Sequence, residues 1–417
     1  MKFQTIFLAS IVILGCGEKS SRGESKMAEK RSVFYFSDVS EKSGLGGYLH
    51  ENGAFGEKWF PEPMGAGGGF IDYNGDSWED ILLITGGIFR ESGKENIPAI
   101  RLLHNNTDGT FSDVSDEVGL GNVFTYPFGI AAADFDNDGD QDFLLTTLYE
   151  NLLFKNTSGY FTEVGSESGL STEHGLSTSP IFFDADRDGH LDLYVGNYTD
   201  WSPDTDVWCT FRGEKGYCTP EVYNGIPSRY YKNNGDGSFT DRTLEAGFLP
   251  APGKTLGVAE YDYNKDGWPD LYVSNDFDDP DALYHNQKDG TFVDVTAQIL
   301  PHTAWFSMGA DSTDIDGDGW PDLLAADMSG TTHYKDKTTM GAMGTRLWVT
   351  TTDPRQYMRN ALYLGTGTGR MMEAAYLTGI ADSDWTWAVK FADFDGDGRD
   401  ALIDERVAVQ GHRPPVL

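Results

Sequence analysis

The chain has 417 residues, of which 39% are hydrophobic and 13% aromatic, and it contains 50 glycines. This composition is typical of a folded protein rich in strands and turns, not of a disordered one. The formal net charge of −35 at pH 7 would repel nucleic-acid phosphates, so we exclude a nucleic acid as partner.

The first 16 residues have the pattern of a bacterial lipoprotein signal peptide. Lys2 precedes a mostly apolar run, residues 3–14, that is too short to span a bilayer. The segment ends in Ile13-Leu14-Gly15-Cys16, which resembles a lipobox, whose cysteine carries the lipid. Gly17 in place of aspartate, by the same resemblance, favours the outer membrane. We expect an exported lipoprotein of the bacterial cell envelope, anchored only through lipid on Cys16; the alternative is an ordinary secretory signal cleaved nearby.

Residues 17–32 are polar and charged and contain no core-forming positions. We expect them to form a flexible tether that leads to a repeat domain at residues 33–400. That domain opens with residues 34–40, Phe-Tyr-Phe-Ser-Asp-Val-Ser, which have the pattern of a single strand.

Six acidic loops then recur along the chain. In the second loop, Asp134, Asp136, Asp138 and Asp142 stand at positions 1, 3, 5 and 9, and Gly139 permits the sharp reversal at position 6. Alternate side chains of a tight loop can converge on one point, and hard carboxylate oxygens suit Ca²⁺. We therefore predict several Ca²⁺ ions with a structural role. The predicted metal ligands are Asp72, Asn74, Asp76 and Asp80; Asp134, Asp136, Asp138 and Asp142; Asp184, Asp186, Asp188 and Asp192; Asp262, Asn264, Asp266 and Asp270; Asp314, Asp316, Asp318 and Asp322; and Asp393, Asp395 and Asp397.

Two of these loops depart from the pattern, and other uses of such loops can be excluded. Ser77 replaces the turn glycine of the first loop, and Ala401 occupies position 9 of the sixth, whose last ligand is missing or displaced to Asp400. An EF-hand is excluded because position 12 is apolar instead of glutamate. Dockerins carry two close copies, and the Gly-Gly-x-Gly-x-Asp pattern of β-rolls is absent.

A second half-repeat follows each of the first four loops. Residues 105–111, 155–161, 233–239 and 286–292 each place Asn and Gly between apolar runs, which predicts a hairpin turn. We call the six acidic loops the metal loops. One unit is therefore a strand, a metal loop, a second strand, a connection, a third strand, the hairpin and a fourth strand. Four antiparallel strands in a recurring unit predict a propeller blade.

The loops and hairpins resemble FG-GAP/VCBS repeats and, more closely, bacterial propellers related to cartilage acidic protein, which usually carry a C-terminal ASPIC/UnbV domain. The resemblance covers residue 34 to about residue 400. It implies an all-β fold, a β-propeller of four-stranded antiparallel blades, typically seven, with Ca²⁺ between the first and second strands as in integrin α heads. No ASPIC/UnbV segment is visible here.

The two ends do not match a complete ring of blades. The sequence holds about five and a half blades, and the strand at residues 34–40 resembles a fourth strand that would complete the last blade and so remove two sheet edges. We expect residues 401–417 to form an irregular tail, produced by truncation or a frameshift. The alternative is a natural six-bladed variant.

Strand order places the metal loops and hairpins on one face and the long insertions on the other. We call the second face the insertion face. The long insertions expected there are residues 86–100, 197–229 and 328–359. Tryptophans gather there, which suits an extracellular protein or glycan ligand; the alternative is that they plug the insertions onto the blades. The tryptophans of this candidate ligand face are Trp201, Trp208, Trp305, Trp348, Trp385 and Trp387.

Cys209 and Cys218 lie in the second insertion of a chain that we expect to be exported. An oxidising compartment favours a disulfide between them over two free thiols. A zinc pair is disfavoured because no cluster of His or Cys accompanies them.

We expect an extracytoplasmic, membrane-anchored module for binding, adhesion or assembly. The alternative is a carbohydrate-active enzyme, a polysaccharide lyase or hydrolase, that uses the aromatic insertion face. The sequence contains no HExxH, GxSxG, phosphate loop or cofactor motif, so we assign no catalytic residue.

Overall fold

The computed structural model describes residues 36–53, 56–65, 67–90, 97–170, 175–211, 213–248, 253–277, 279–335 and 353–406. The expected signal peptide, its Cys16, the tether at residues 17–32 and Trp348 lie outside these residues. Within the described ranges, no helix combines the length and the apolar character needed to cross a membrane.

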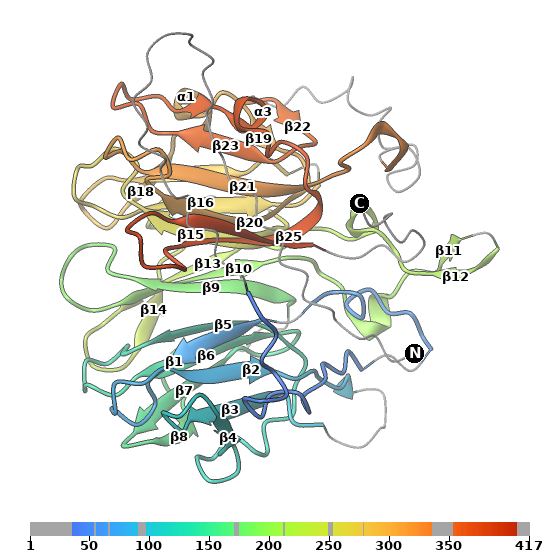
Figure 1. The fold of residues 1–417 in the computed structure, drawn as a ribbon, viewed down its shortest axis with the longest axis vertical. Helices are drawn as coiled ribbons and strands as arrows, with labels where there is room; N and C mark the ends of the chain where they lie inside the picture. Colours follow the sequence, from blue (N-terminus) through green and yellow to red (C-terminus); the bar gives the residue numbers. More distant parts are fainter. Residues whose placement is uncertain are drawn as a thin grey trace, which may run out of the picture.

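The described part of the chain forms five consecutive four-stranded antiparallel blades of a β-propeller (Figure 1), which confirms the predicted fold class. The strands are β1 (Gly68–Ile71), β2 (Asp80–Ile84), β3 (Ile100–Asn105) and β4 (Phe111–Asp113) in blade 1; β5 (Pro127–Ala133), β6 (Asp142–Thr147), β7 (Leu152–Thr157) and β8 (Tyr160–Glu163) in blade 2; β9 (Ser177–Phe183), β10 (Asp192–Asn197), β13 (Arg229–Asn233) and β14 (Phe239–Asp241) in blade 3; β15 (Thr255–Tyr261), β16 (Asp270–Asn275), β17 (Ala282–Asn286) and β18 (Phe292–Asp294) in blade 4; and β20 (Ser307–Thr313), β21 (Asp322–Ser329), β23 (Ala361–Leu364) and β24 (Met372–Glu373) in blade 5. Each predicted metal loop joins the first two strands of its unit.

A sixth unit contributes two strands, β25 (Asp384–Ala392) and β26 (Ala401–Arg406), paired from Ala392 and Ala401 outward. β25 also pairs with the end of β21 through Met328 and Trp385. The expectation of an irregular tail from residue 401 was wrong for residues 401–406. Ala401 lacks the acid of the other loops, but the apolar residues after it still continue the repeat as a strand. Residues 407–417 lie outside the described ranges.

The first strands of consecutive blades lie side by side: β1, β5, β9, β15, β20 and β25. Glycine allows their backbones to approach. A Cβ atom on Gly129 would lie 2.0 Å from the carbonyl oxygen of Thr178 in the next blade, and one on Gly257 would lie 2.5 Å from that of Met308. The first strands of neighbouring blades can therefore approach this closely only because they carry glycine at these positions.

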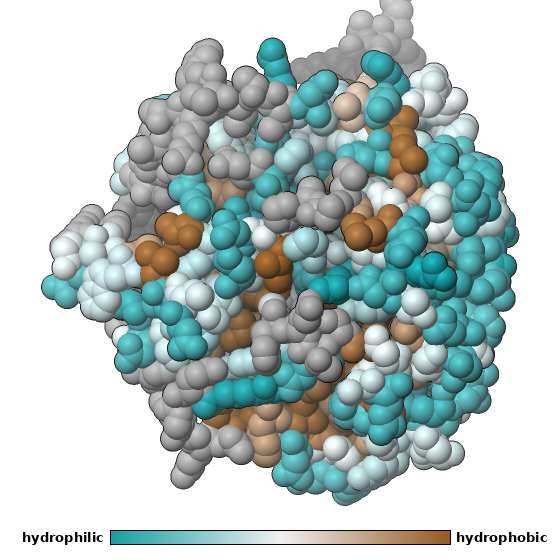
Figure 2. Space-filling model, turned by 180° about the vertical axis from the view of Figure 1, so that it is seen from behind, coloured by the Kyte–Doolittle hydropathy of each residue, from teal (hydrophilic) through white to brown (hydrophobic). Residues whose placement is uncertain are grey.

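Apolar side chains fill the interfaces between blades. Between blades 2 and 3, Leu144, Leu153, Leu193 and Tyr231 are all at most 3% exposed. Outside this core the surface seen in Figure 2 is mainly hydrophilic, with hydrophobic residues in separate patches. This distribution agrees with the strong negative charge of the chain.

The N-terminal segment lies beside the sixth unit. Over its described part, residues 36–40, the expected strand is not formed. The ring of Phe36 nevertheless packs against that of Phe394, with centroids 5.5 Å apart. The next residues reach blade 1, where the carbonyl of Ser43 accepts a 2.8 Å hydrogen bond from the amide of Phe111. The segment thus contacts the C-terminal unit, as expected, without pairing as a strand.

Candidate functional site

The metal loops share one backbone construction. In the second loop, Asp134 accepts hydrogen bonds from the amides of Asp138 at 3.1 Å and Gly139 at 2.9 Å. The same two bonds recur in the five other loops. The aspartate at position 1 therefore fixes the turn in every copy, including the first loop, where Ser77 adopts a φ of 68° in place of glycine.

Carboxylates converge in four of the loops. One oxygen from each member of a set lies within 4.8 Å of the others. Two oxygens that bind one Ca²⁺ at about 2.3–2.6 Å can be at most about 5 Å apart, so this spacing fits the ion. In the first and fourth loops, Asn74 and Asn264 supply an amide oxygen at position 3 instead. The four sets are Asp134, Asp136 and Asp142; Asp184, Asp186 and Asp188; Asp314, Asp316 and Asp322; and Asp393, Asp395 and Asp397.

The aspartate at position 9 is buried at the start of the second strand of each of the five blades. In blade 2, Asp142 accepts the amide of Asn156 at 2.7 Å. Burial, with the charges of Asp136 and Asp138, raises the pKa of Asp142 to about 7. In the first and fourth loops the Oδ2 atoms of Asp80 and Asp270 are buried without a hydrogen-bond partner in the described structure. A bound cation would satisfy these oxygens, so the residues fit Ca²⁺.

Two lysines from the third strands enter the loops. Lys155 contacts Asp136 and lies 3.0 Å from Asp138. Lys232 lies 2.9 Å from Asp186, 2.8 Å from Asp188 and 3.2 Å from Asp192. The hydrogen bond to Asp136 raises the pKa of Lys155. Each ammonium neutralises part of its loop, so loops 2 and 3 carry an internal cation.

The corresponding residue differs between blades, and its role was not predicted from the sequence. His104 lies 3.1 Å from Asp80, and His285 lies 3.0 Å from Asp270. In blade 5 the position is taken by Leu364, which offers no charge. In the sequence, this position is the residue immediately before the first asparagine of each hairpin half-repeat, or before Gly365 in blade 5. A basic residue at this position could have indicated a contact with the loop.

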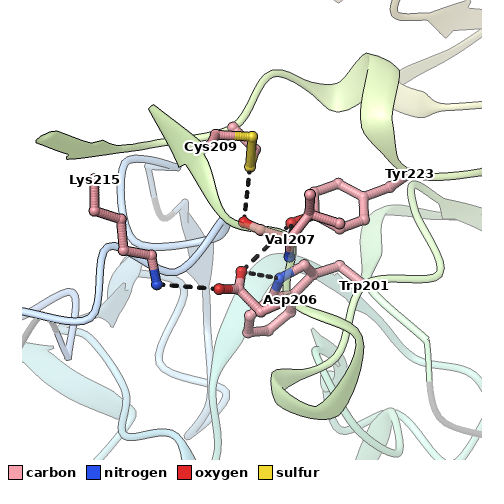
Figure 3. The surroundings of a disulfide bond; sticks show 7 residues. Trp201, Asp206, Val207, Cys209, Lys215 and Tyr223 are labelled. Carbon is pink, nitrogen blue, oxygen red and sulfur yellow. Dashed lines mark hydrogen bonds and ion pairs between the residues drawn. A yellow bond between two sulfur atoms is a disulfide. The ribbon is translucent and has the colours of Figure 1, made fainter. Parts of the chain in front are cut away.

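The predicted disulfide between Cys209 and Cys218 is confirmed. It closes the hairpin of β11 (Cys209–Phe211) and β12 (Glu214–Gly216), which projects from the right-hand side of Figure 1. Asp206 anchors the base of the hairpin (Figure 3). Its carboxylate accepts hydrogen bonds from the Trp201 indole at 3.0 Å and the Lys215 ammonium at 3.2 Å.

The tryptophans of the candidate ligand face differ in exposure. Trp201 and Trp305 are 2% exposed and pack into apolar clusters, so neither presents a ring to a ligand. Trp385 and Trp387 are half-buried against the cluster around Trp305. These four side chains therefore contribute to apolar packing, and Trp385 and Trp387 belong to strand β25. Trp208 is 69% exposed, with the Lys215 ammonium 5.1 Å from its ring centroid.

A cavity of about 500 Å³ opens at the insertion-face end of blade 3, and no sequence pattern indicated it. It is lined by residues of β9, β10, β13, β14 and the turn after β14, together with Asn151 of blade 2. Its lining consists of Asn151, Gly175, Ser177, Val195, Asn197, Ile226, Pro227, Ser228, Arg229, Tyr231, Asp241, Thr243, Leu244 and Glu245.

Three further carboxylates, Asp276, Asp281 and Asp327, are at most 2% exposed near the insertion-face ends of blades 4 and 5. Asp276 accepts the hydroxyl of Tyr198 at 2.6 Å, and Asp281 accepts that of Tyr272 at 2.5 Å. Burial raises the pKa of Asp276 to about 8 and those of Asp281 and Asp327 to about 7. At neutral pH these three carboxyls are therefore partly protonated, whereas exposed carboxyls would be ionised.

Comparison with known proteins agrees with the repeat pattern. A model of the FG-GAP-like repeat matches residues 72–145, 204–273 and 262–325. The chain therefore contains FG-GAP-like repeats, arranged as propeller blades. No curated protein matches the sequence.

Two solved structures are distantly similar. One is an Agrocybe aegerita lectin that recognises non-reducing terminal N-acetylglucosamine, with 16% identity, a TM-score of 0.42, and coverage of 81% of this chain and 74% of the lectin. The other is the V. cholerae biofilm matrix protein Bap1, with 14% identity, a TM-score of 0.38, and coverage of 78% and 41%. At these scores neither similarity supports an argument about this chain.

Proposed function

We propose that this chain is an exported, calcium-stabilised β-propeller that acts as a binding or adhesion module of the bacterial cell envelope. In this proposal Ca²⁺ occupies the metal loops, and the opposite insertion face binds an extracellular protein or glycan. A lipid on Cys16 holds the module at the outer membrane, as in the ASPIC/UnbV-associated lipoproteins that the repeats resemble. One observation carries the proposal. The repeated metal loops lie at one end of the blades, and the exposed insertion hairpin lies at the opposite end.

The case for calcium rests on uncompensated charge. Loop 5 brings Asp314, Asp316 and Asp322 together, and in the described structure no ammonium or imidazole pairs with these carboxylates; Lys265 reaches the loop only at the backbone carbonyl of Gly319. Burial raises the pKa of Asp322 to about 6, because the folded chain disfavours its ionised form. An ion that binds only the folded state stabilises it by about 2.7 kcal/mol at a concentration of 100 times Kd.

The case for binding rests on the projecting hairpin. Val207, Trp208, Tyr217 and Val222 are between 41% and 69% exposed around a disulfide-closed turn. The base is held by the hydrogen bonds of Asp206 and by Tyr217, whose hydroxyl donates to Glu62 at 2.9 Å. A surface ordered before contact loses little conformational entropy on binding.

Calcium is tested by thermal unfolding of the full chain before and after EDTA treatment. We expect chelation to lower the melting temperature and added Ca²⁺ to restore it, with Mg²⁺ much less effective because it prefers near-ideal octahedral sites. An unchanged melting curve in excess EDTA would contradict the calcium assignment.

The binding face is tested by attachment of the protein to intact cells and to immobilised polysaccharides. Trp208→Ala should reduce attachment at least tenfold, whereas Trp78→Ala should not. Trp78 is the matched control because it is 51% exposed but lies in the first metal loop, on the other face. Equal losses would argue against the insertion face. Release of soluble oligosaccharide would instead favour the carbohydrate-active enzyme.

Anchoring is tested by Cys16→Ala, which should release the protein from the membrane fraction. Retention of this variant in membranes would contradict the lipid anchor.

A further inference from the structure

The cavity at the insertion-face end of blade 3 has an ordered polar lining. The side-chain amide of Asn151 donates to the hydroxyl of Ser177 at 3.1 Å, and Ser177 donates to the amide oxygen of Asn197 at 2.8 Å. The backbone amide of Asn197 donates to the hydroxyl of Ser228 at 3.1 Å. Ser228 also lies 3.0 Å from the hydroxyl of Thr255 in blade 4. This chain of contacts fixes the polar groups before any ligand arrives.

These groups retain hydrogen-bonding capacity for a ligand. Each hydroxyl oxygen has two lone pairs and each side-chain amide has two donors. Asn151 uses one donor on Ser177 and Asn197 uses one on the carbonyl of Pro227, so one donor remains on each amide, while the amide oxygen of Asn151 already accepts from the amide of Thr147. Ser177 and Asn197 are 4% and 7% exposed, so their contacts hold them away from bulk water. A ligand that entered the cavity would meet the remaining amide donors of Asn151 and Asn197 and the remaining lone pairs of the hydroxyls, and vicinal hydroxyl groups can pair with both.

The charges that line the cavity select against anions. Arg229 is the single cation and donates to Asp241 at 2.8 Å, while Glu245 adds a second carboxylate. The lining therefore carries one positive and two negative charges, within a chain of net charge −35. A phosphate, sulfate or uronate would be repelled, whereas the adjacent guanidinium and carboxylate suit a neutral polar group.

Apolar groups complete the cavity. Val195 and Tyr231 belong to the core between blades 2 and 3, and Ile226 and the 66% exposed Leu244 also line the hollow. A pyranose ring has both hydroxyl groups and apolar C–H faces, so it complements such a mixed lining. The volume of about 500 Å³ falls within the range of about 300–1,000 Å³ of typical ligand sites.

We infer that this cavity binds a neutral pyranose residue of an extracellular glycan. The inference rests on the proposed binding function and deepens it by naming a site and a ligand class. It places the sugar on the residues between blades 2 and 3, separate from the ring of Trp208 on the hairpin.

The test uses the full chain in saturating Ca²⁺ with defined trisaccharides, observed by saturation-transfer NMR and titration calorimetry. The neutral probes are trisaccharides of glucose, galactose, mannose and N-acetylglucosamine, and the anionic probe is trigalacturonic acid. We expect at least one neutral probe to bind and trigalacturonic acid not to bind. Failure of all neutral probes, or preference for the anionic one, would overturn the inference.

Variants locate the site. Leu244→Trp should obstruct the cavity and weaken binding at least tenfold, and its exposure means that the fold should tolerate the larger side chain. The matched control is Leu377→Trp, at an 84% exposed leucine in α3 (Ala375–Thr378), which follows the fourth strand of blade 5. Equal affinity of Leu244→Trp and the unaltered chain would overturn the inference.

A charge reversal gives an independent readout. Glu245→Lys changes the lining from one positive and two negative charges to two positive and one negative, so it should introduce measurable affinity for trigalacturonic acid. No gain would contradict charge selection by this cavity. If Leu244→Trp has no effect while Trp208→Ala still abolishes attachment to cells, the cavity inference fails and the proposed function stands. If neither change affects attachment, both fail.

Discussion

The side-chain amide of Asn233 donates a hydrogen bond to the backbone carbonyl of Phe135, 2.8 Å away, and so connects the third strand of blade 3 to the metal loop of blade 2. The same contact joins Asn156 to Tyr73 at 2.8 Å and Asn286 to Ala185 at 2.7 Å. The equivalent position in blade 5 is Gly365, which has no side chain to donate. Each metal loop reached by such a contact therefore also fastens the next blade.

Removing this contact should destabilise the propeller. Asn233→Ala leaves the buried carbonyl of Phe135 and the carbonyl of Leu191, which also accepts from Asn233 at 2.9 Å, without this donor. We expect a loss of about 2–3 kcal/mol in the free energy of unfolding, measured by urea denaturation in Ca²⁺. Asn234→Ala is the control, because Asn234 is exposed and, among the described residues, its side chain bonds within its own hairpin, to Ser238 and Thr240. Equal losses in both variants would argue against the inter-blade role.

The internal lysines should weaken calcium binding in their loops. Lys232→Met removes the ammonium that contacts Asp186, Asp188 and Asp192. We expect about tenfold tighter Ca²⁺ binding at one site, equivalent to about 1.4 kcal/mol, together with lower stability of the metal-free protein. Titration calorimetry on EDTA-treated protein measures the affinity, and thermal unfolding measures the stability.

Lys335→Met is the control for this prediction. The Lys335 ammonium contacts Asp384 at the insertion-face end of β25, away from the metal loops. Its removal should leave the calcium affinities nearly unchanged. If Lys232→Met weakens calcium binding, the lysine supports the site instead of competing with the ion.

The buried carboxyls Asp276, Asp281 and Asp327 should make stability depend on pH. Their pKa values of about 7–8 in the folded chain exceed the value of about 3.9 for an unfolded aspartate. The folded state therefore binds more protons between about pH 4 and pH 8, so their contribution to the free energy of unfolding falls as the pH rises through this window. The facing charged and titratable groups are Lys254, Tyr198, Tyr272 and Tyr363, and Asp327 also faces the other two carboxyls.

Asp327→Asn tests this dependence, because asparagine cannot ionise and its oxygen can still accept from the amides of Trp305 and Phe306. At constant Ca²⁺, the variant should be more stable than the unaltered chain at pH 8.5 and no more stable at pH 5.5. Chemical denaturation at the two pH values measures the difference. Destabilisation by a similar amount at both would show that the ionised carboxylate is itself required.

The blades could be predicted from the sequence because each short residue pattern determines the structure of its own segment. The loop from Asp134 to Asp142 makes its turn through its own side chains, and the following run is the buried strand β6. The same rule failed at Ala401, where the absent acid suggested an end although the strand pattern continued in β26. The strand depends on the apolar residues after the loop and not on the ligand.

The site could not be predicted as fully because it depends on contacts between distant parts of the chain. Lys232 reaches a loop residue 46 positions away, Asp186, so its role follows only from the blade register. The burial of Trp201 depends on Trp59 and Phe89, which come from other segments. The cavity depends on the volume that neighbouring side chains leave unfilled, and residue patterns do not report that volume.

The disulfide should stabilise the hairpin and not the blades. β11 and β12 form a separate two-stranded sheet, while β9, β10, β13 and β14 complete blade 3 without them. Replacing both Cys209 and Cys218 by serine removes a loop constraint of about 2–3 kcal/mol. We expect proteolytic cleavage between residues 206 and 218 to accelerate at least tenfold while the melting temperature of the propeller falls by no more than a few degrees. Reduction of the unaltered protein with dithiothreitol should reproduce this result. A large fall in melting temperature would instead show that the hairpin holds the blades together through its contacts with Lys58 and Glu62.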